Sequence, residues 1–295
     1  MRIGVTGCNG FIGTYLTRSL TRAGHQVVGL ARRSAVPQRV EHIRDHLADL
    51  VVGDLEDDAA LKKLADSVEC VVHNALARER GDPLAHFRSN VLGSLHLLHF
   101  AQRAGVRQFI FISSVAVYHT ILQDRKLDEN HPTWPKDLYG AYKASIEPFL
   151  MAYHGQHGMN TVALRPPAVY GVAPVLPQSH WYDLICRVKR GEDIDTPVGG
   201  KIVHVHDVAA AVCAAVGNQA VAGRLFNVVD CYIYDEQVAV MARELTGSDS
   251  RIVDHRGPGP RNHFDVRASR EMLGVPLNRG HDGVREYVAE LLSRM

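Results

Sequence analysis

Short apolar runs alternate with longer amphipathic stretches up to residue 113. The amphipathic stretches repeat at about 3.6 residues, as in helices with one buried face, and they cover residues 11–23, 57–67 and 83–104. The apolar runs have the length and the β-branched content of strands: 2–6, 26–31, 51–53, 70–73 and 107–113. This alternation predicts a parallel sheet with helices on both faces, and right-handed crossovers make it a doubly wound α/β fold of Rossmann type.

The pattern changes after Ser114. A long polar loop over 119–136 precedes a helix over 138–157 and a strand over 161–165. Four prolines fall within 166–178, where we expect no regular element. The rest of the chain predicts a strand near 202–206, a helix over 207–217, a strand over 224–228, a helix over 233–246 and a last helix over 282–293. The loops at 119–136 and 166–181 are long enough to be lids or binding loops.

Composition and charge narrow the classes of function. The chain is 46% hydrophobic and 22% charged with a net charge of +1, which argues against nucleic acid or a membrane surface as the main partner. No run approaches the roughly 18 apolar residues of a membrane span, and a strand begins at residue 2. We therefore expect no signal peptide and a cytoplasmic protein with reduced cysteines. The histidine pairs His96/His99 and His204/His206 lack a third ligand at a zinc-like spacing, so we expect no metal.

A glycine-rich turn follows the first predicted strand. It reads Thr-Gly-Cys-Asn-Gly-Phe-Ile-Gly over residues 6–13 and opens an amphipathic helix. Gly7 permits the sharp turn, Gly10 lets the backbone approach a pyrophosphate, and Gly13 lets the helix pack on the strand. The N–H groups and the dipole at the helix N-terminus then favour phosphate. A dinucleotide-binding domain is therefore expected in the N-terminal half.

A second motif places a tyrosine and a lysine on one face of a helix. Tyr139 and Lys143 are four residues apart within the helix predicted over 138–157. Tyrosine has a pKa of about 10 in water, and a nearby ammonium with an oxidised nicotinamide lowers it. Tyr139 can then give a proton to a carbonyl oxygen or take one from an alcohol. Such a pair is also common on exposed helices, but the glycine turn upstream favours catalysis.

The order of these motifs resembles that of the NAD-dependent epimerase/dehydratase family, a branch of the extended short-chain dehydrogenases/reductases. The glycine spacing is the GxxGxxG of that group, and the resemblance extends over nearly the whole chain. Further matching segments are Asp54-Leu55, Asn74-Ala75, Asn90–Gly93, Ser113–Tyr118, Arg165–Gly171 and His204–Ala209. One departure is His119, which replaces the usual glycine.

The resemblance implies three catalytic residues. Tyr139 is the acid/base, Lys143 tunes it and holds the nicotinamide ribose, and Ser114 orients the substrate oxygen. Together with two arginines after the second strand, the residues expected to contact the cofactor are Gly7, Asn9, Gly10, Phe11, Ile12, Gly13, Arg32, Arg33, Asp54, Leu55, Asn74, Ala75, Leu76, Asn90, Ser113, Tyr139, Lys143, Pro166, Ala168 and Val169. We expect residues 1–165 to be the dinucleotide-binding domain and 166–295 mostly a small substrate-binding subdomain, with 200–230 partly returning to the Rossmann core.

The end of the second strand bears on the choice of cofactor. The family places an acid there to bind the 2′-hydroxyl of the adenosine ribose, whereas Ala31 occupies that position here and Arg32 and Arg33 follow. Arginine forms charge-assisted hydrogen bonds with a 2′-phosphate, so we expect NADP. The alternative is that both arginines are solvated loop charges and that NAD binds.

Departures from the family's motifs reduce the number of reaction types that this chain can be expected to catalyse. Val115-Ala116 stand where dehydratases of the family carry an acid pair, which argues against dehydration. Ala168 and Gly200-Lys201 replace an asparagine and an arginine that bind the diphosphate in nucleotide-sugar epimerases. The remaining candidates for binding a diphosphate are Lys201, as a point charge without the bidentate fork of arginine, and the tail arginines Arg256, Arg261 and Arg267.

We therefore expect an oxidoreductase that moves a hydride between NAD(P) and a carbonyl or secondary alcohol of a small molecule, sugar-derived ones included. The first alternative is a sugar or nucleotide-sugar epimerase that retains NAD, and the second is a non-catalytic dinucleotide sensor, which the Tyr139–Lys143 pair disfavours. Trp181 and Tyr182 fit either stacking on a bound ring or a core position. The helices at 85–104 and 138–157 suit a homodimer, since relatives pair them in a four-helix bundle, but an apolar helix also suits a buried position in a monomer.

Overall fold

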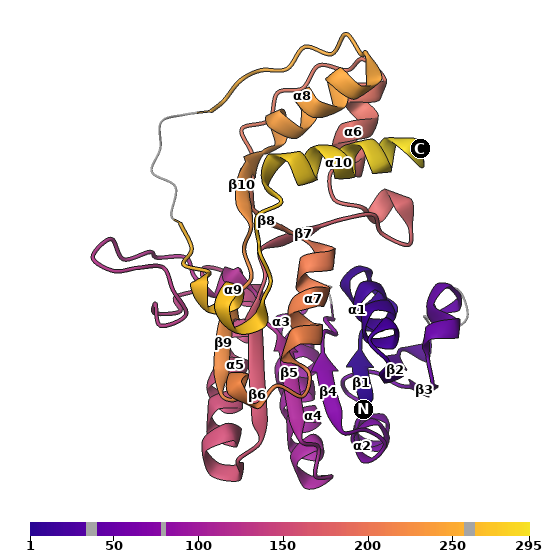
Figure 1. Ribbon diagram of the computed structural model, residues 1–295, viewed down its shortest axis with the longest axis vertical. Helices are drawn as coiled ribbons and strands as arrows, with labels where there is room; N and C mark the ends of the chain where they lie inside the picture. Colours follow the sequence, from indigo (N-terminus) through magenta and orange to yellow (C-terminus); the bar gives the residue numbers. More distant parts are fainter. Residues whose placement is uncertain (34–39, 78–80, 257–262) are drawn as a thin grey trace.

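The computed structural model of the chain describes residues 1–33, 40–77, 81–256 and 263–295, which form a larger and a smaller lobe (Figure 1). The larger lobe is built on a seven-stranded sheet in the order β3-β2-β1-β4-β5-β6-β9. Its strands are β1 (Arg2–Thr6), β2 (Gln26–Ala31), β3 (Asp49–Val52), β4 (Cys70–His73), β5 (Gln108–Ile112), β6 (Asn160–Arg165) and β9 (Arg224–Asn227). All neighbouring pairs are parallel, so the predicted doubly wound parallel sheet is confirmed.

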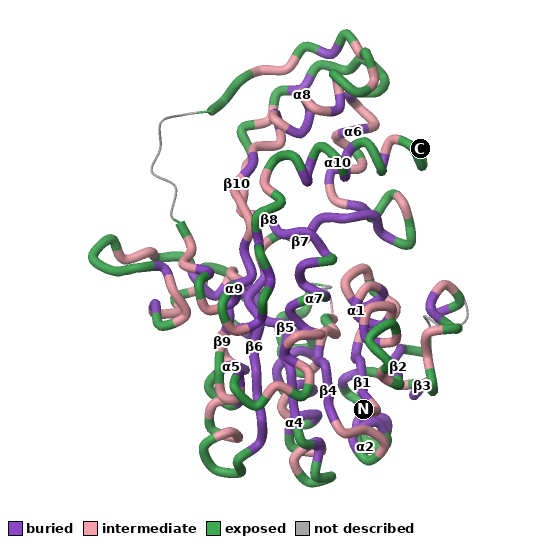
Figure 2. Tube along the Cα trace, viewed as in Figure 1, coloured by how far each residue is buried: buried purple, intermediate pink, exposed green. Residues whose placement is uncertain are grey.

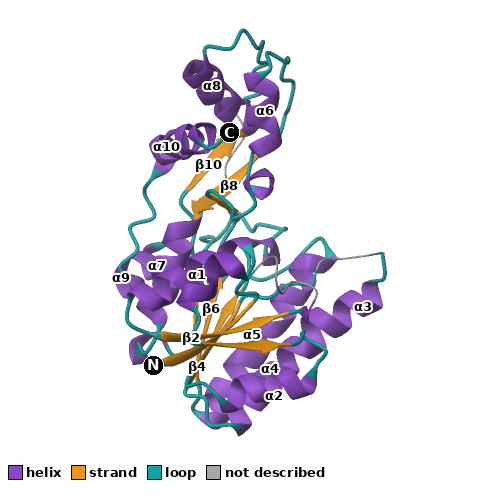
Figure 3. Cartoon of the chain, turned by 90° about the vertical axis from the view of Figure 1, so that its right-hand side faces the viewer, coloured by secondary structure: helices purple, strands orange, loops and turns teal. Residues whose placement is uncertain are grey.

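Helices cover both faces of this sheet (Figure 3). One face carries α1 (Phe11–Arg22), α7 (Val205–Ala215) and α9 (Arg267–Leu273). The other carries α2 (Asp58–Asp66), α4 (Gly93–Arg103) and α5 (Leu138–His157). The short helix α3 (Pro83–Phe87) and a π-helical turn, η3 (Arg88–Leu92), lead directly into α4. The sheet is therefore the middle layer of three, as in doubly wound folds.

Alternating strand residues form the two cores of the larger lobe. In β5, Ile110 and Ile112 pack with the helices on the α1 side, whereas Phe109 and Phe111 pack on the α4 side. This alternation follows from the two-residue period of a strand, and it explains why the strands read as continuous apolar runs. The central strands β1, β4, β5 and β6 are almost entirely buried, whereas the outer strand β3 is partly exposed (Figure 2).

The smaller lobe is built on a three-stranded sheet. Its strands are β7 (Ala168–Tyr170), β8 (Gly199–His204) and β10 (Cys231–Tyr234), with β7 parallel and β10 antiparallel to β8. The helices α6 (Tyr182–Lys189), α8 (Asp235–Thr246) and α10 (Gly280–Ser293) pack against one another beside this sheet. Short 3₁₀ turns complete the fold: η2 (Glu41–His46), η4 (Val115–Val117), η5 (Leu176–Gln178) and η6 (Gln219–Val221).

Several elements differ from the sequence-based expectation. The segment 166–178 does contain a strand, β7, and a 3₁₀ turn, because all four prolines lie outside the three residues of β7. The strand expected near 202–206 ends at His204, since α7 already begins at Val205, and it belongs to the smaller sheet. Three short elements that the pattern did not indicate are α6, β10 and α9.

Trp181 is a core residue of the smaller lobe. It precedes α6 with a positive φ of 61°, and its indole nitrogen donates a hydrogen bond to Asp235 over 2.8 Å. Its ring packs among Tyr170 and Tyr287, with the side chain almost fully buried. Of the two interpretations of Trp181, the structure supports the core position.

Candidate active site

The glycine turn joins β1 to α1 at the carboxyl end of the sheet, beside β4. Gly7 has a φ of 65°, and a Cβ there would lie 2.9 Å from the Ala75 backbone. A Cβ at Gly13 would overlap the Gly7 carbonyl oxygen. Gly10 is the N-cap of α1 and offers no side chain to the first turn, whose first intrahelical bond is Thr14 N–H to Gly10 oxygen. The turn thus leaves N–H groups open toward an anion, and the residues fit a dinucleotide pyrophosphate.

Replacing Gly13 with alanine tests this packing. Because the new methyl group overlaps backbone rather than a movable side chain, we expect α1 to shift, with a loss of about 1–3 kcal/mol in unfolding free energy and at least tenfold weaker nucleotide binding. Gly155→Ala is the matched control, since its Cβ meets open space within α5. Thermal melts and nucleotide titration of both variants measure the effect. Equal behaviour of the two variants contradicts the expected clash.

A buried polar chain holds the loop that follows β4. Thr6 Oγ1 accepts hydrogen bonds from the N–H groups of Asn74 and Ala75, at 3.1 and 3.0 Å, and is bonded to His73 Nδ1 at 2.7 Å. Burial lowers the pKa of His73 to about 3, so this ring is neutral. Asn90 then clamps the loop, because its side chain bonds both the N–H and the carbonyl of Ala77. Thr6 and His73 were not singled out as site residues from the sequence.

The predicted adenosine side of the site lies beyond β2 and β3. Arg32 and Arg33 follow the end of β2 and are exposed. Asp54 is turned toward its own loop, where it accepts a hydrogen bond from the Glu56 N–H over 2.9 Å. Leu55 is a core residue against which Gly93 packs closely. The contacts of these residues with a cofactor stay predictions.

Close packing of helix α5 places Tyr139 beside Ser114. The Asp137 carboxylate caps α5 by accepting the Gly140 N–H over 2.7 Å. A Cβ at Gly140 would overlap the Ala116 carbonyl oxygen, so only glycine allows α5 to approach η4 this closely. Ser114 caps η4, accepting the Ala116 N–H over 3.1 Å. The two predicted catalytic hydroxyls therefore lie close together at one cavity, near enough for Ser114 to lower the pKa of the Tyr139 phenol.

Burial dominates the electrostatics of Tyr139 in the protein alone. Burial raises the pKa of Tyr139, the Ser114 hydrogen bond opposes this, and the Asp137 carboxylate raises it further. Lys143 does not counter the burial, because its ammonium is itself buried and donates to the Ile112 carbonyl oxygen over 2.6 Å. Burial lowers the pKa of Lys143 to about 7, against an opposing effect of Glu147. In the protein alone Tyr139 is therefore a protonated acid at neutral pH, which suits it to donate to a carbonyl oxygen.

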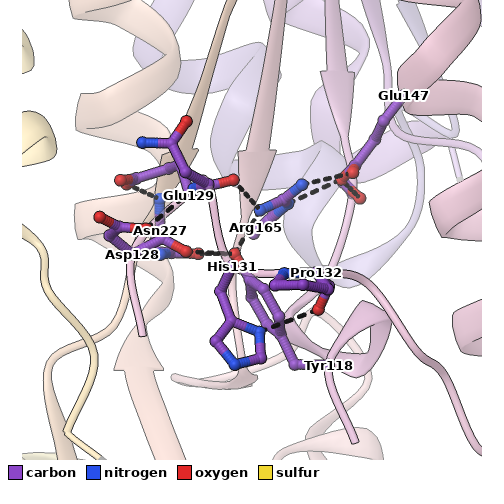
Figure 4. Close-up of polar contacts among 10 residues, drawn as sticks. Tyr118, Asp128, Glu129, His131, Pro132, Glu147, Arg165 and Asn227 are labelled. Carbon is purple, nitrogen blue, oxygen red and sulfur yellow. Dashed lines mark hydrogen bonds and ion pairs between the residues drawn. The ribbon is translucent and has the colours of Figure 1, made fainter. Parts of the chain in front are cut away.

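A buried ion pair supports the catalytic segment from behind (Figure 4). Arg165 donates from Nε and Nη2 to the two oxygens of Glu147, over 2.9 and 2.6 Å, and both side chains are almost fully buried. Ser113 donates to the same Glu147 over 2.6 Å. Tyr118 accepts a hydrogen bond from Arg165 and donates to Asn227 over 3.1 Å. Ser113, a predicted cofactor residue, thus has its hydroxyl committed to this network.

A cavity of about 660 Å³ opens above the catalytic pair. Its lining comes from η4, the start of α5, the strands β7, β8 and β10, and the tail. The lining residues are Ser114, Val115, Ala116, Tyr118, His119, Ile121, Leu127, Lys136, Tyr139, Pro167, Ala168, Gly199, Gly200, Lys201, Tyr232 and Phe264. The structure therefore brings Ser114, Tyr139 and Ala168 to one cavity and keeps Lys143 beneath it.

Two findings bear on the other expectations. Within the described ranges, no group of three or more His, Cys, Asp or Glu side chains is placed to hold a metal ion. Those ranges also contain no helix that is both long and apolar enough to cross a bilayer. His204 and His206 stack on one another, with ring centroids 5.2 Å apart, and burial lowers the pKa of His204 to about 4.

Comparison with known proteins agrees with this geometry. Residues 3–228 match the family described as the NAD dependent epimerase/dehydratase family. A Synechocystis protein provisionally named dihydroflavonol 4-reductase is 31% identical over 70% of the chain and 60% of its own length. A UDP-glucose 4-epimerase of Vibrio cholerae is 29% identical over 82% of the chain and 74% of its own length. A short-chain dehydrogenase/reductase superfamily protein of Agrobacterium tumefaciens, solved with bound NAD, has a TM-score of 0.80 at 25% identity, covering 100% of this chain and 98% of its own.

The chain belongs to the NAD-dependent epimerase/dehydratase family of extended short-chain dehydrogenases/reductases. Its homologues are nicotinamide-dependent epimerases and reductases. The predicted family, the fold class and the general type of enzyme, a nicotinamide-dependent oxidoreductase or epimerase, are therefore confirmed. A nicotinamide cofactor follows from the same findings.

Proposed function

We propose that the protein is an NADP-dependent oxidoreductase that interconverts a carbonyl and a secondary alcohol on a small molecule. The observation that supports this most is that Ser114 and Tyr139 meet at the floor of a cavity whose described lining holds no arginine and no carboxylate. A proton donor, a hydrogen-bonding hydroxyl and an adjacent dinucleotide turn are sufficient for carbonyl reduction. The acid pair that the family's dehydratases use and the arginine that its nucleotide-sugar epimerases use for a diphosphate are both absent from this described lining.

Each catalytic side chain has a distinct role in this proposal. When bound, the nicotinamide supplies or accepts the hydride. Tyr139 gives its phenolic proton to the substrate oxygen, and Ser114 donates a hydrogen bond that orients the same oxygen. Lys143, whose ammonium donates to the Ile112 carbonyl beneath the site, would hold the nicotinamide ribose when the cofactor is bound. Because burial raises the pKa of Tyr139, oxidation of an alcohol, which needs the phenolate, is expected to accelerate as the pH rises.

A nucleotide-sugar epimerase with retained NAD is the second candidate, since relatives carry that name. This chain has few basic side chains that are placed and free to bind a diphosphate. Gly200 lies in the segment where the family's epimerases carry an arginine. A Cβ at Gly200 would meet open space, so no other described side chain occupies the place of that arginine. In the tail, Arg256 is paired with Asp254 and Arg267 with Asp265, while Arg261 lies outside the described residues. These features favour the oxidoreductase.

Transfer of a deuteride tests the proposed reaction directly. The protein is incubated with NADPH carrying deuterium at C4 and a panel of small aldehydes and ketones, and the products are analysed by mass spectrometry. We expect deuterium on the carbinol carbon of at least one product together with stoichiometric NADP⁺. Epimerised sugars without net oxidation of the cofactor would instead support the second candidate.

Arg32 is proposed to select NADP over NAD. Its guanidinium is exposed after β2, at the edge where an adenosine ribose would lie. Arg32→Glu removes the partner of a 2′-phosphate and adds repulsion, so NADPH binding should weaken at least tenfold while NADH binding is retained. Arg103→Glu, at an exposed position at the end of α4, is the control. Fluorescence titrations with both nucleotides measure the ratio of NADPH to NADH affinity. An unchanged NADPH affinity in Arg32→Glu would mean that Arg32 is a solvated charge that does not contact the cofactor.

A homodimer is proposed through α3, α4 and α5. Large apolar side chains are exposed along this face, including Leu84 at 65%, Phe87 at 49% and Phe149 at 45%. Exposed apolar clusters of this kind are typical of interfaces. We expect light scattering to give twice the chain mass of 32.6 kDa and Phe149→Glu to give one chain mass. Leu245→Glu, an exposed leucine of α8, is the control, and a monomeric native protein would end the proposal.

A further inference from the structure

Lys201 presents a half-buried ammonium to the cavity above the catalytic pair. It lies on β8, opposite Tyr232 of β10, and its Nζ is 5.8 Å from the Tyr232 ring centroid and 5.3 Å from that of Phe264. Two aromatic rings on this wall restrict where the lysine chain can go, so the charge is held near the cavity rather than free in solvent. Burial lowers the pKa of Lys201, which shows that its surroundings offer incomplete compensation.

The charges around the cavity all have one sign. Lys136 and Lys201 line it, and among its described lining residues there is no Asp or Glu. In the part of the chain that the structure describes, neither lysine forms an ion pair with a carboxylate. A partly buried ammonium without a carboxylate partner favours an anion from solution, because the pair would recover the solvation that burial removes.

The rest of the lining limits the size and character of that anion. Val115, Ile121, Leu127 and Phe264 give one side an apolar surface, and Gly199 and Gly200 keep the β8 side free of long side chains. The tail closes over this side, since Leu127 and Phe264 are joined by a parallel β-bridge. The cavity thus combines a reactive floor, an apolar side and a positive wall.

We propose that Lys201 is a specificity-determining residue and that the substrate is a small, partly apolar molecule carrying an oxyanion, either a carboxylate or a phosphate. Its carbonyl or alcohol group lies against Ser114 and Tyr139, and its oxyanion lies on Lys201. This inference rests on the proposed oxidoreductase function and names its substrate class. It uses a lysine one position away from Gly200, where the family's arginine is missing.

Binding of shape-matched probes tests the inference without requiring turnover. The probes are 4-(hydroxymethyl)benzoate, 4-(hydroxymethyl)phenyl phosphate and the uncharged methyl ester of the benzoate, titrated by calorimetry into the NADP⁺-loaded full chain. We expect at least one anion to bind about tenfold or more tightly than the ester, as for one charge-assisted contact. The stronger of the two anions then identifies the preferred oxyanion.

Variants at Lys201 separate a specific contact from general attraction to the oxidised cofactor. Lys201→Gln should bring the anion-to-ester affinity ratio to about one, whereas Lys201→Arg should keep it. Lys63→Gln, exposed on α2, is the control and should leave the ratio unchanged. Melting curves verify that each variant is folded. A ratio near one in the native protein, no binding of any probe, or a ratio that survives Lys201→Gln would overturn the proposal.

Turnover assays distinguish a failure of the oxyanion site from a failure of the proposed oxidoreductase function. If anions bind through Lys201 but no carbonyl compound is reduced with NADPH or NADH, the oxidoreductase function fails while the oxyanion site stands. If 4-formylbenzoate and its methyl ester are reduced with equal kcat/KM in the native protein and in Lys201→Gln, the function stands and the oxyanion site fails.

Discussion

Tyr139→Phe is expected to reduce kcat by about 10²–10⁴-fold, the range of a lost general acid. The phenol lines the cavity beside Ser114 and is the proposed proton donor, so its removal leaves the substrate oxygen without that proton source. Nucleotide affinity should change little, because the dinucleotide turn is formed by other residues. Steady-state kinetics with a nucleotide titration on the same preparation measure both quantities.

Tyr142→Phe is the matched control for this experiment. Tyr142 lies on the same helix, its ring packs edge-on against Tyr139 at 5.5 Å, and its buried hydroxyl makes no hydrogen bond among the described residues. Removing that hydroxyl should leave kcat unchanged and the melting temperature equal or higher. Comparable losses in Tyr139→Phe and Tyr142→Phe would mean that packing, rather than proton transfer, explains the first effect.

Arg165→Met is expected to cost about 3–5 kcal/mol of unfolding free energy, the largest stability effect predicted for this protein. Arg165 is almost fully buried and neutralises Glu147 through two hydrogen bonds, so its removal leaves the buried carboxylate with Ser113 as its one hydrogen-bond donor among the described residues. Tyr118 also loses the donor to its oxygen. Chemical denaturation of the native protein and the variant measures the change.

A double-mutant cycle shows whether the charge pair is responsible. Glu147→Leu alone should also be strongly destabilising, whereas Arg165→Met combined with Glu147→Leu should cost less than the sum of the two single variants, because no uncompensated charge remains. The exposed pair of Arg285 and Glu244 is a suitable comparison, and Arg285→Met should cost less than about 1 kcal/mol. Additive losses at Arg165 and Glu147 would contradict a coupled buried pair.

The parts of the fold with local signals were predictable from the sequence. Gly7, Gly10 and Gly13 identify the dinucleotide turn by their spacing, and the structure requires glycine at Gly7, for its positive φ, and at Gly13, for its close backbone packing. The parallel strands followed from continuous apolar runs, since both faces of the sheet are covered. Short elements such as β10 and α6 were missed, because four to eight residues carry too little periodicity to be distinguished from loops.

The parts of the site that depend on distant segments were not predictable. Phe264 meets Leu127 through an isolated bridge. The family resemblance suggested Lys201 as a point charge for the substrate, but its neighbours in the cavity wall follow from the pairing of β8 with β10 in a separate small sheet. The burial of Tyr139 was also not predictable: in the protein alone burial raises the pKa of its phenol, and the Lys143 ammonium donates to the Ile112 carbonyl. The lowered pKa expected with an oxidised nicotinamide bound stays a prediction. Burial is a property of the assembled structure, not of residue spacing.

The nucleotide carried by the purified protein distinguishes an enzyme that exchanges its cofactor from one that retains it. The chain is purified without added nucleotide and denatured, the released nucleotide is identified and counted by mass spectrometry, and the emptied protein is titrated with NADPH and NADH. An oxidoreductase must release its cofactor in each cycle, so we expect little bound nucleotide and tighter binding of NADPH. Close to one NAD per chain, surviving purification and not displaced by NADPH, would contradict the proposed function and favour an epimerase.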